Sequence, residues 1–466
     1  MASRALPDGG PTSDGPLEVQ TLSIPIADRL HWLDRFAAGL RRQHDRLVAT
    51  VVEELGKPAW EVTLTEMLPL LASIHWHRRH LKRLLGPKRQ RGGAWWQWGD
   101  AVRTERTAVG RVLLIATWNY PIQLLGVQLV QSIAAGNETW VKPSERSPRA
   151  QSLLLSTVRW ALGEAGIPQD MLVECDASRE EGERLLREHH FDHVLFTGST
   201  AVGRSIAEIA ASRLMPTTLE LSGHDSAIVC ADADLDLAAR SIWQAVLLNA
   251  GQTCMAPRRV LVEAAAYRHF LGRLAPLAAA TSPLTMVDAP AATRTFAAVR
   301  DALQRGGRSL SGVVEPPNGR ALRPHAVADA TPESTLFAGE HFGPAVAMTS
   351  VADLNEAFGL HRSVGQALAT SVFTRSPKAI RARAASLGTS FVTINDCVRP
   401  TSHPATALAG RGTSGWGASR GAGGLLALTR EVTVTERGWL TPPPEAPSER
   451  LMVWIRRWSG LTGGHP

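Results

Sequence analysis

The residue best suited to covalent chemistry is Cys254, which lies in the small-residue run 249–257, NAGQTCMAP. Upstream of it, Glu220 places a carboxylate in the otherwise apolar segment 219–223, LELSG. A thiol can attack an electrophilic carbon, and a carboxylate can activate the water that releases the product. A buried structural thiol and a partnered core carboxylate are the alternatives. We interpret Cys254 as a candidate nucleophile and Glu220 as a candidate base that activates water.

Asn119 can complement this pair. It follows the apolar run 112–116 and lies in the segment 116–121, ATWNYP. At the end of a buried strand, its side-chain amide could point into a crevice and stabilise an oxyanion. On this pattern alone, an asparagine that caps the next helix is the competing interpretation.

A glycine-rich turn at 197–203, TGSTAVG, lies between the strand-like run 193–196 and a predicted helix over 204–211. Backbone N–H groups and the helix dipole face a ligand at such a turn, so it can bind an anion. The pattern is Gly-x-Thr-x-x-Gly and not the usual Gly-x-Gly-x-x-Gly. An ordinary connection between a strand and a helix has the same appearance.

Lys142 and Glu145 end another candidate strand, 139–142. Ligands of open α/β sheets bind at the carboxyl edge of the strands, where an acid and a base could hold ribose hydroxyls. A solvated charge pair is the alternative.

The elements that must position these residues alternate in type. Apolar residues near a 3.6-residue period predict one long or two short helices over 26–55, and a second helical stretch over 60–84. From Val112 onward, short strand-like runs alternate with helical ones, which is typical of a doubly wound parallel sheet. A second α/β stretch follows over 217–400, and a glycine-rich loop then leads to the strand-like run 431–435.

Composition excludes several classes of function. The four cysteines of the 466 residues are widely spaced, so neither a disulfide framework nor a zinc site is predicted, and a reducing compartment suits them. We expect no metal, no signal peptide and no membrane span. The net charge is +7, but the basic residues are scattered, so nucleic-acid binding is not predicted.

The order of the motifs resembles the aldehyde dehydrogenase superfamily, and most closely its short, class-3-like branch. The resemblance extends over about 26–435 and is carried by these blocks: Trp118-Asn119-Tyr120-Pro121, Gly136-Asn137, Val141-Lys142-Pro143-Ser144-Glu145, Phe196-Thr197-Gly198-Ser199-Thr200, Leu219-Glu220-Leu221, Gly251-Gln252-Thr253-Cys254 and Glu340-His341-Phe342-Gly343-Pro344.

The resemblance implies oxidation of an aldehyde to a carboxylic acid with NAD, or alternatively NADP. It makes Cys254 the nucleophile that forms a thiohemiacetal and then a thioester, and Glu220 the base that hydrolyses the thioester. The Asn119 amide and the Cys254 N–H would form the oxyanion hole. The residues implied to bind the cofactor are Trp118, Lys142, Ser144, Glu145, Gly198, Ser199, Gly203, Leu221, Glu340 and Phe342.

The chain departs from the family pattern at Thr117, in the segment 221–225 at Ser222 and His224, and in the segment 406–410, where Leu408 is one of the differences. Ser222 adds a side chain beside the expected nicotinamide pocket, and Leu408 stands where the family often has Phe. A catalytically silent protein on the same fold is a rival interpretation that Ser222 and His224 favour, and a CoA-acylating dehydrogenase is another. A CoA-acylating enzyme would not need Glu220.

We expect an α/β fold with a Rossmann-like NAD(P)-binding domain over 1–220, a catalytic α/β domain over 221–400 and a small β extension over 401–437. A strand at about 93–107 would join that extension, which the resemblance assigns to a homodimer. The remaining 438–466 form a C-terminal tail.

The tail carries Leu451, Trp454, Ile455 and Trp458 at i, i+3, i+4 and i+7, among arginines. The segment 448–461 could therefore lie on anionic lipid. Packing of the same face on the protein itself or on a partner subunit is the alternative. We expect a cytoplasmic protein, with peripheral contact at the inner face of the membrane and a hydrophobic or long-chain aldehyde as substrate.

Overall fold

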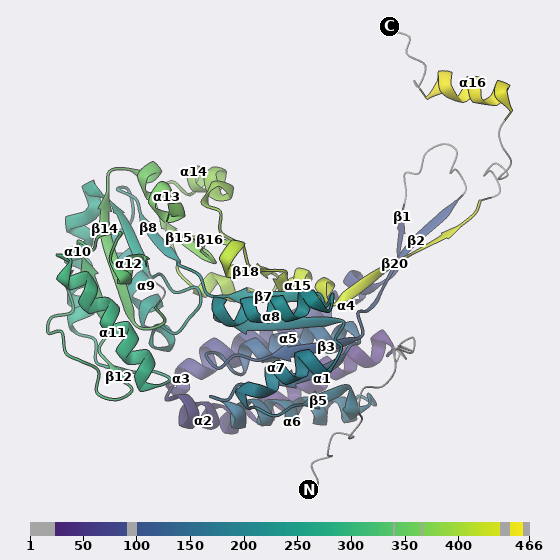
Figure 1. Cartoon of the computed structure of the whole chain (residues 1–466), viewed down its shortest axis with the longest axis horizontal. Coiled ribbons are helices and arrows are strands. Elements are labelled where there is room, and N and C mark those ends of the chain that lie inside the picture. The colour runs from purple at the N-terminus through teal and green to yellow at the C-terminus, as the bar shows by residue number, and fades with distance from the viewer. Residues whose placement is uncertain are drawn as a thin grey trace. The chain divides into compact units, whose positions relative to one another are not determined.

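The structure is a computed structural model that describes residues 24–90, 100–338, 341–363, 365, 367–438 and 448–459. The chain divides into two compact units (Figure 1). The first comprises Met1–Leu85 and Thr107–Arg430, and the second comprises Gly86–Arg106 and Glu431–Pro466. The described residues include no helix that is long and apolar enough to cross a membrane.

The first unit contains a six-stranded sheet whose strands are parallel except at one edge. The edge strand at 415–416 runs antiparallel to its neighbour, so the glycine-rich loop near the C-terminus completes this sheet. The strand order is β18 (Gly415–Trp416), β7 (Thr217–Leu221), β6 (His193–Gly198), β3 (Arg111–Ile115), β4 (Glu138–Lys142) and β5 (Leu172–Glu174).

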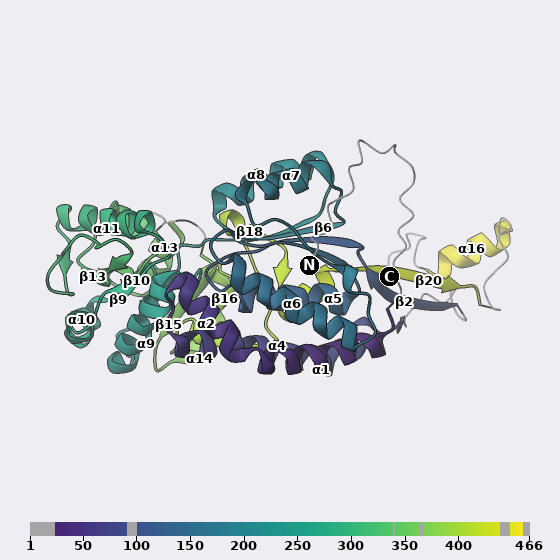
Figure 2. The same cartoon turned by 90° about the horizontal axis from the view of Figure 1, so that it is seen from below.

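Helices cover both faces of this sheet (Figure 2). Successive side chains of a strand point to opposite faces, so Val112 and Leu114 join one core while Leu113 joins the other. The first core packs against α1 (Ile26–Arg42), α2 (His44–Leu55), α4 (Leu68–Leu85), α5 (Gln123–Ala135) and α6 (Pro148–Glu164). The second packs against α7 (Arg179–Glu188) and α8 (Thr200–Ser212).

A second sheet of seven strands lies in the same unit and is parallel except for its first strand. Its order is β11 (Arg308–Ser309), β13 (His325–Ala328), β14 (Ala345–Val351), β9 (Arg259–Glu263), β8 (Ser226–Val229), β15 (Ala369–Phe373) and β16 (Phe391–Ile394). One core packs on α9 (Leu235–Leu247) and α10 (Ala264–Ala279), and the other on α11 (Ala289–Gln304), α12 (Thr335–Ala338), α13 (Leu354–Ser363) and α14 (Pro377–Arg383).

Short elements connect these layers. A helix, a π-helical turn and α4 follow one another closely, and this region borders the site described below. The elements are α3 (Ala59–Val62), the π-helix Thr63–Met67, α15 (Gly421–Ala427), and the paired strands β10 (Leu284–Thr285) with β12 (Ala321–Leu322) and β17 (Leu408–Ala409) with β19 (Ala418–Ser419).

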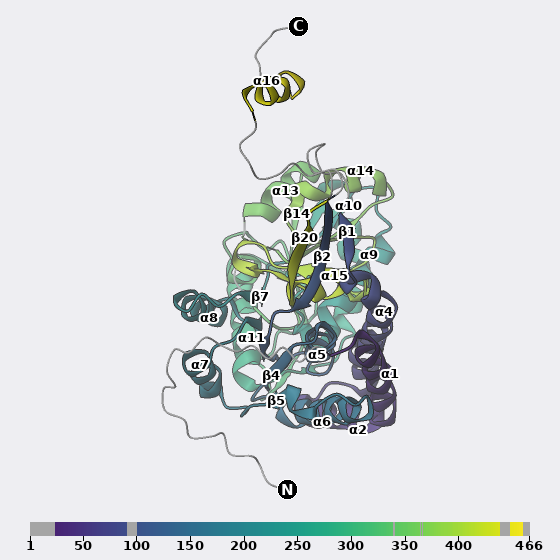
Figure 3. The same cartoon turned by 90° about the vertical axis from the view of Figure 1, so that its right-hand side faces the viewer.

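The second unit holds most of a three-stranded sheet and one helix. The strands β1 (Lys88–Gln90), β2 (Ala101–Ala108) and β20 (Thr429–Glu436) lie side by side (Figure 3). All residues of β20 after Thr429 are exposed. The helix α16 (Glu449–Trp458) has no buried residue, and its Trp454 and Trp458 rings stack at 5.9 Å.

The predicted α/β fold with parallel sheets is confirmed. Of the two forms expected for 26–55, the chain adopts two helices, because it breaks at Gln43. Within 401–437, the part from Leu408 to Ala427 belongs to the first unit, and only β20 contributes to the three-stranded sheet.

Candidate active site

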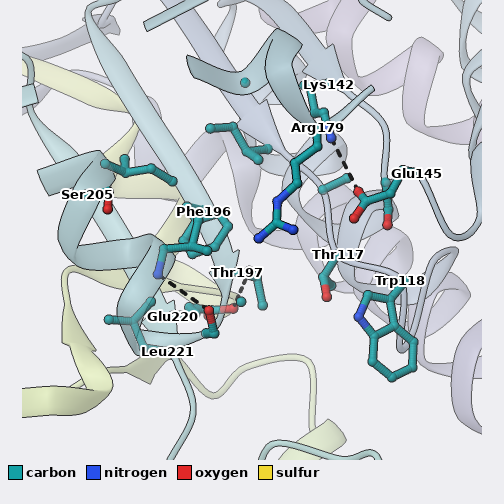
Figure 4. Close-up of a pocket in the computed structure, with 18 of the residues that line it drawn as sticks. Thr117, Trp118, Lys142, Glu145, Arg179, Phe196, Thr197, Ser205, Glu220 and Leu221 are labelled. Atoms are coloured by element: carbon teal, nitrogen blue, oxygen red, sulfur yellow. Dashed lines mark hydrogen bonds and ion pairs between the residues drawn. The ribbon is translucent and has the colours of Figure 1, made fainter. Parts of the chain in front are cut away.

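The carboxyl ends of β3, β4, β6 and β7 open into one large cavity of about 910 Å³, called here the larger cavity (Figure 4). This is the edge at which open α/β sheets bind ligands. Eleven of the thirteen residues predicted to act on the substrate or to bind the cofactor line it, and Ser222 lines it as well. The eleven are Trp118, Asn119, Lys142, Ser144, Glu145, Gly198, Ser199, Glu220, Leu221, Cys254 and Phe342.

A smaller cavity of about 560 Å³ also reaches Cys254. Its walls come from the π-helix region, α9 and the segment after β16. Trp60, Leu64, Leu124 and Val398 make part of the wall apolar. The thiol of Cys254 therefore lies where the two cavities meet, accessible from both.

The turn that presents Cys254 is unusual in its backbone. Asn249, Ala250 and Gly251 have φ of 52°, 51° and 71°, in the left-handed region. A Cβ on Gly251 would lie 2.2 Å from the backbone of Gly343, so only glycine fits there. Such strained residues persist only where the surroundings over-determine them, and they concentrate at functional sites.

Hydrogen bonds from distant residues hold this turn. Arg258 donates through Nη1 to the carbonyl of Gly251 and through Nη2 to that of Thr253, both at 2.8 Å. Glu61 accepts from the Asn249 N–H at 2.5 Å, and the Tyr120 and Thr253 hydroxyls lie 2.6 Å apart. The nucleophile candidate is thus positioned by several elements at once.

The thiol is surrounded by charges of both signs. Burial raises the pKa of Cys254 to about 11, and the guanidinium of Arg420 opposes that rise. Glu220 and Asp225 raise the pKa further, whereas Arg258 lowers it. The other cysteines, Cys175, Cys230 and Cys397, are also free.

Asn119 is buried, and its side chain does not cap α5, whose N-terminal cap residue is Ile122. The Asn119 Nδ2 donates to the carbonyl of Gln252 at 3.0 Å, and its Oδ1 accepts from the Thr117 hydroxyl at 3.0 Å. This hydrogen bond holds the Asn119 amide next to the turn that carries Cys254. This supports the oxyanion interpretation over the capping one.

Glu220 is buried at the end of β7 and lines the larger cavity. Its Oε2 accepts a hydrogen bond of 3.1 Å from the Thr197 hydroxyl. Its Oε1 is buried and has no hydrogen-bond partner among the described residues. Burial raises the pKa of Glu220, while Arg420 and the Thr197 hydroxyl lower it. A carboxylate with one free oxygen and a raised pKa suits general-base catalysis.

The residues beside the larger cavity suit a dinucleotide. Ser199 caps α8 by accepting from the Val202 N–H, so the helix N-terminus faces the cavity. Lys142 and Glu145 lie 3.5 Å apart in its lining, which also includes Arg179 of α7 (Figure 4). This cradle fits the phosphates and ribose of a nicotinamide dinucleotide.

One predicted cofactor residue does not line the cavity, and another falls outside the part of the chain that the structure describes. Gly203 lies beneath it, where a Cβ would meet Leu221 at 2.4 Å, so its part is close packing of α8 on β7. Glu340 lies outside the described residues. Of the departures from the family pattern, Ser222 lines the larger cavity, and Leu408 is buried in the small cluster that Cys254 contacts.

Several site residues could not be recognised from the sequence. Lys57 and Glu66 form a buried ion pair of 2.6 Å, and Lys57 also donates to the Asn119 carbonyl at 2.9 Å. Glu66 accepts from the Ile122 N–H at 2.8 Å and so fixes the start of α5. Arg420 is the other such residue. A lysine and a glutamate nine residues apart in a helical region give no local signal of burial.

Among the described residues, no cluster of histidine, cysteine and carboxylate side chains could hold a metal ion. The arrangement instead combines a thiol, an amide donor and a carboxylate at the junction of two cavities. It can form a covalent adduct with a carbonyl compound and then hydrolyse it.

The comparisons with known proteins agree with this chemistry. A model of the aldehyde dehydrogenase family matches residues 20–434. Over 404 residues the chain is 29% identical to aldehyde dehydrogenase family 3 member A2 of Rattus norvegicus, with 86% of this chain and 82% of the relative covered. It is also 29% identical to the 4,4'-diapolycopene-4,4'-dial dehydrogenase of Cytobacillus firmus, with 86% of this chain and 92% of that relative covered.

A third relative is the dimeric NADP-preferring aldehyde dehydrogenase of Canis lupus familiaris, which is 29% identical over 85% of this chain and 87% of its own length. Among solved structures, the AldH of Staphylococcus aureus in a substrate-bound state superposes with a TM-score of 0.83. It is 24% identical and covers 94% of this chain and 96% of its own. That likeness supports the fold.

Proposed function

The chain belongs to the aldehyde dehydrogenase family, and from this premise we propose how it carries out NAD(P)-dependent oxidation of an aldehyde to a carboxylic acid. The observation that carries the proposal is that Cys254 lies where the larger and the smaller cavity meet. The larger cavity then takes the cofactor and the smaller one takes the aldehyde.

In the first half-reaction, the Cys254 thiolate attacks the aldehyde carbon and forms a C–S bond. The carbonyl oxygen becomes an alkoxide, which accepts hydrogen bonds from the Asn119 amide and the Cys254 N–H. The nicotinamide ring supplies the hydride acceptor when the cofactor is bound. Loss of hydride from the tetrahedral carbon leaves a thioester on Sγ.

In the second half-reaction, Glu220 takes a proton from a water molecule. The resulting hydroxide attacks the thioester carbon, the C–S bond breaks, and the carboxylic acid leaves while Cys254 regains its thiolate. The free Oε1 of Glu220 is the atom that we assign to this water. A buried carboxylate at this position argues against the CoA-acylating and catalytically silent alternatives.

Residues of four strand ends hold the cofactor. Lys142 and Glu145 bind the adenosine ribose, and Ser199 with the N-terminus of α8 binds the pyrophosphate. Phe342 and Trp118, whose rings lie 5.9 Å apart, pack beside the nicotinamide end. The list of cofactor residues is completed by Ser144, Gly198, Leu221 and Glu340. NAD is the main cofactor, with NADP as the alternative.

The substrate is a hydrophobic aldehyde. Trp60 and Leu64, each 55% exposed, stand at the smaller cavity and present apolar surface to solvent. Leu68, also half exposed, continues this surface along α4. A long acyl chain could extend from Cys254 over these side chains and remove them from water. The relatedness to a dehydrogenase named for 4,4'-diapolycopene-4,4'-dial is in line with this substrate class.

The protein acts as a cytoplasmic homodimer with peripheral contact at the inner face of the membrane. Its four free cysteines suit a reducing compartment, and one relative is named as dimeric. The exposed strand β20 is available for pairing with a partner subunit. The exposed tryptophans of α16 are available for contact with lipid. The proposed division of labour is cofactor binding by 1–220, catalysis by 221–400 and, within 401–437, dimerisation by the exposed strand β20.

A serine substitution tests the core of this proposal. Cys254→Ser should lose nearly all aldehyde oxidation, measured as NADH absorbance at 340 nm, while NAD binding persists. Cys175→Ser is the matched control, because that cysteine lies outside both cavities. Full activity of Cys254→Ser would overturn the mechanism.

A further inference from the structure

Arg420 is a charged residue of the smaller cavity that the mechanism above leaves unused. It lines that cavity together with Cys254. Its Nη1 donates to the Thr401 carbonyl at 3.2 Å, which fixes the direction of the guanidinium. Its Nε is buried and has no hydrogen-bond partner, and no ion pair involves Arg420 among the described residues. A buried guanidinium N–H without a partner is costly, so the fold keeps Arg420 beside the cavity at a cost in stability.

The backbone at Arg420 is also strained. Its φ is 62°, which a non-glycine residue rarely adopts. Gln131 supports this conformation, since its Oε1 accepts from the Arg420 N–H at 3.3 Å and its Nε2 donates to the Gly421 carbonyl at 3.1 Å. A Cβ on Gly424 would lie 2.6 Å from this amide, so glycine there leaves it room. The fold thus holds one arginine in an unfavourable conformation, aimed at the cavity.

Arg420 differs from the other arginines near Cys254 in its partners. Arg258, the other guanidinium nearby, already donates to the carbonyls of Gly251 and Thr253. Arg399 reaches the same cavity, but it is mostly exposed and paired with Asp396. The groups around the thiol are Glu220, Asp225, Arg258 and Arg420, with Tyr120, Asp396 and Arg399 on the walls of the smaller cavity.

We propose that Arg420 is a positioning residue for catalysis, whose guanidinium stabilises the thiolate of Cys254 and so makes it a nucleophile near neutral pH. The two acidic neighbours and the burial of the thiol work against ionisation. Arg420 opposes them, and it also favours the ionised form of Glu220. One cation therefore serves both half-reactions. This inference rests on the proposed role of Cys254.

Alkylation by iodoacetamide tests the inference without aldehyde or cofactor. The reagent is neutral and reacts with thiolates, so the pH dependence of its rate reports the pKa of the thiol. In the full-length protein, the rate at Cys254 is followed by mass spectrometry of its peptide from pH 6 to 10. Cys397, which lines the same cavity, is the internal reference for reagent access.

We expect Arg420→Gln to move the Cys254 profile to higher pH, with about tenfold slower alkylation at pH 8, because one pKa unit changes the thiolate fraction tenfold. Alkylation of Cys397 should not change. Arg420→Lys should retain most of the rate. Arg399→Gln is the matched control, since it removes an equal charge that Asp396 and solvent already screen, and its profile should stay within about twofold of the parent's.

An unchanged Cys254 profile in a folded Arg420→Gln protein would overturn the inference, as would an equal shift in Arg399→Gln. Arg420→Met serves as the neutral variant if Arg420→Gln does not fold. A failure of the proposed function gives a different result. In that case Cys254→Ser retains oxidation activity, whatever the alkylation profile of the Arg420 variants.

Discussion

Thr197 and Glu220 lie opposite each other on β6 and β7, and the Thr197 hydroxyl donates a 3.1 Å hydrogen bond to Oε2 of Glu220. The parallel register of the two strands brings about this contact. It orients the carboxylate so that one oxygen is held by the protein and the other is left for water. The pair therefore links the sheet directly to the hydrolytic step that we propose.

Replacement of the base should separate the two half-reactions. Glu220→Gln keeps the shape of the side chain but cannot take a proton from water. We expect a burst of NADH of about one per active site, followed by a stall at the acyl-enzyme. Rapid mixing with an aldehyde measures the burst, and mass spectrometry detects the acyl group on Cys254. Unchanged steady turnover would show that another group activates the water.

Replacement of Thr197 should change the pH dependence instead. Burial raises the pKa of Glu220, and the Thr197 hydroxyl opposes that rise by stabilising the charged form. Thr197→Val should raise the pKa further, so the fall of kcat at low pH should begin about one pH unit higher. The change should vanish well above the pKa, where Glu220 is ionised in both proteins. A uniform loss of kcat across the pH range would contradict this explanation.

Cofactor choice should depend on two opposite charges at the larger cavity. Glu145 lies beside Lys142, and its carboxylate disfavours a phosphate on the ribose. Arg179 lines the same cavity and has no ion pair among the described residues. Glu145→Gln should raise the ratio of kcat/KM for NADP to that for NAD by about tenfold, on the order of 1.4 kcal/mol. Arg179→Gln should lower it. A parent enzyme that prefers NADP would reverse the expected preference for NAD.

The exposed apolar side chains at the smaller cavity should affect kcat/KM for long substrates only. Trp60→Ala and Leu64→Ala remove surface that a long acyl chain would cover. We expect kcat/KM for decanal to fall by roughly tenfold or more in the double variant, because each buried methylene contributes about 0.8 kcal/mol. The value for propanal should change little. Equal losses for both aldehydes would indicate damage to the site and not a chain-length effect.

The C-terminal helix should bind anionic lipid weakly. Leu451, Trp454 and Trp458 are exposed on α16, and Arg456 and Arg457 lie in its last turn. The full chain should co-sediment with anionic liposomes more than a chain that ends at Pro447, and the difference should shrink at high salt. The double variant Trp454→Ser with Trp458→Ser should co-sediment with the liposomes only as much as the shortened chain does. Equal partitioning of all three proteins would remove the membrane contact.

Much of the fold and of the candidate site follows from local sequence patterns. The run 112–116 is apolar at every position, as a strand buried on both faces requires, and its first four residues lie in β3, which has helices on either side. The glycine-rich turn after β6 leads into a helix, as predicted, but α8 begins at Thr200 and not at the expected residue 204, because Ser199 caps it. Cys254 and Glu220 could be selected because each interrupts a run of small or apolar residues with one reactive group.

Only the tertiary structure determined which residues distant in the chain lie around Cys254 and Asn119. Arg420 reaches the smaller cavity because Gln131, far away in the chain, holds its strained backbone. Lys57 supports Asn119 through a contact between residues 62 positions apart. Such pairs leave no periodic or local signal, because burial and ionisation depend on the packing of several elements. A sequence pattern can indicate the proposed nucleophile, but the electric field around the thiol arises only from the folded arrangement of charges.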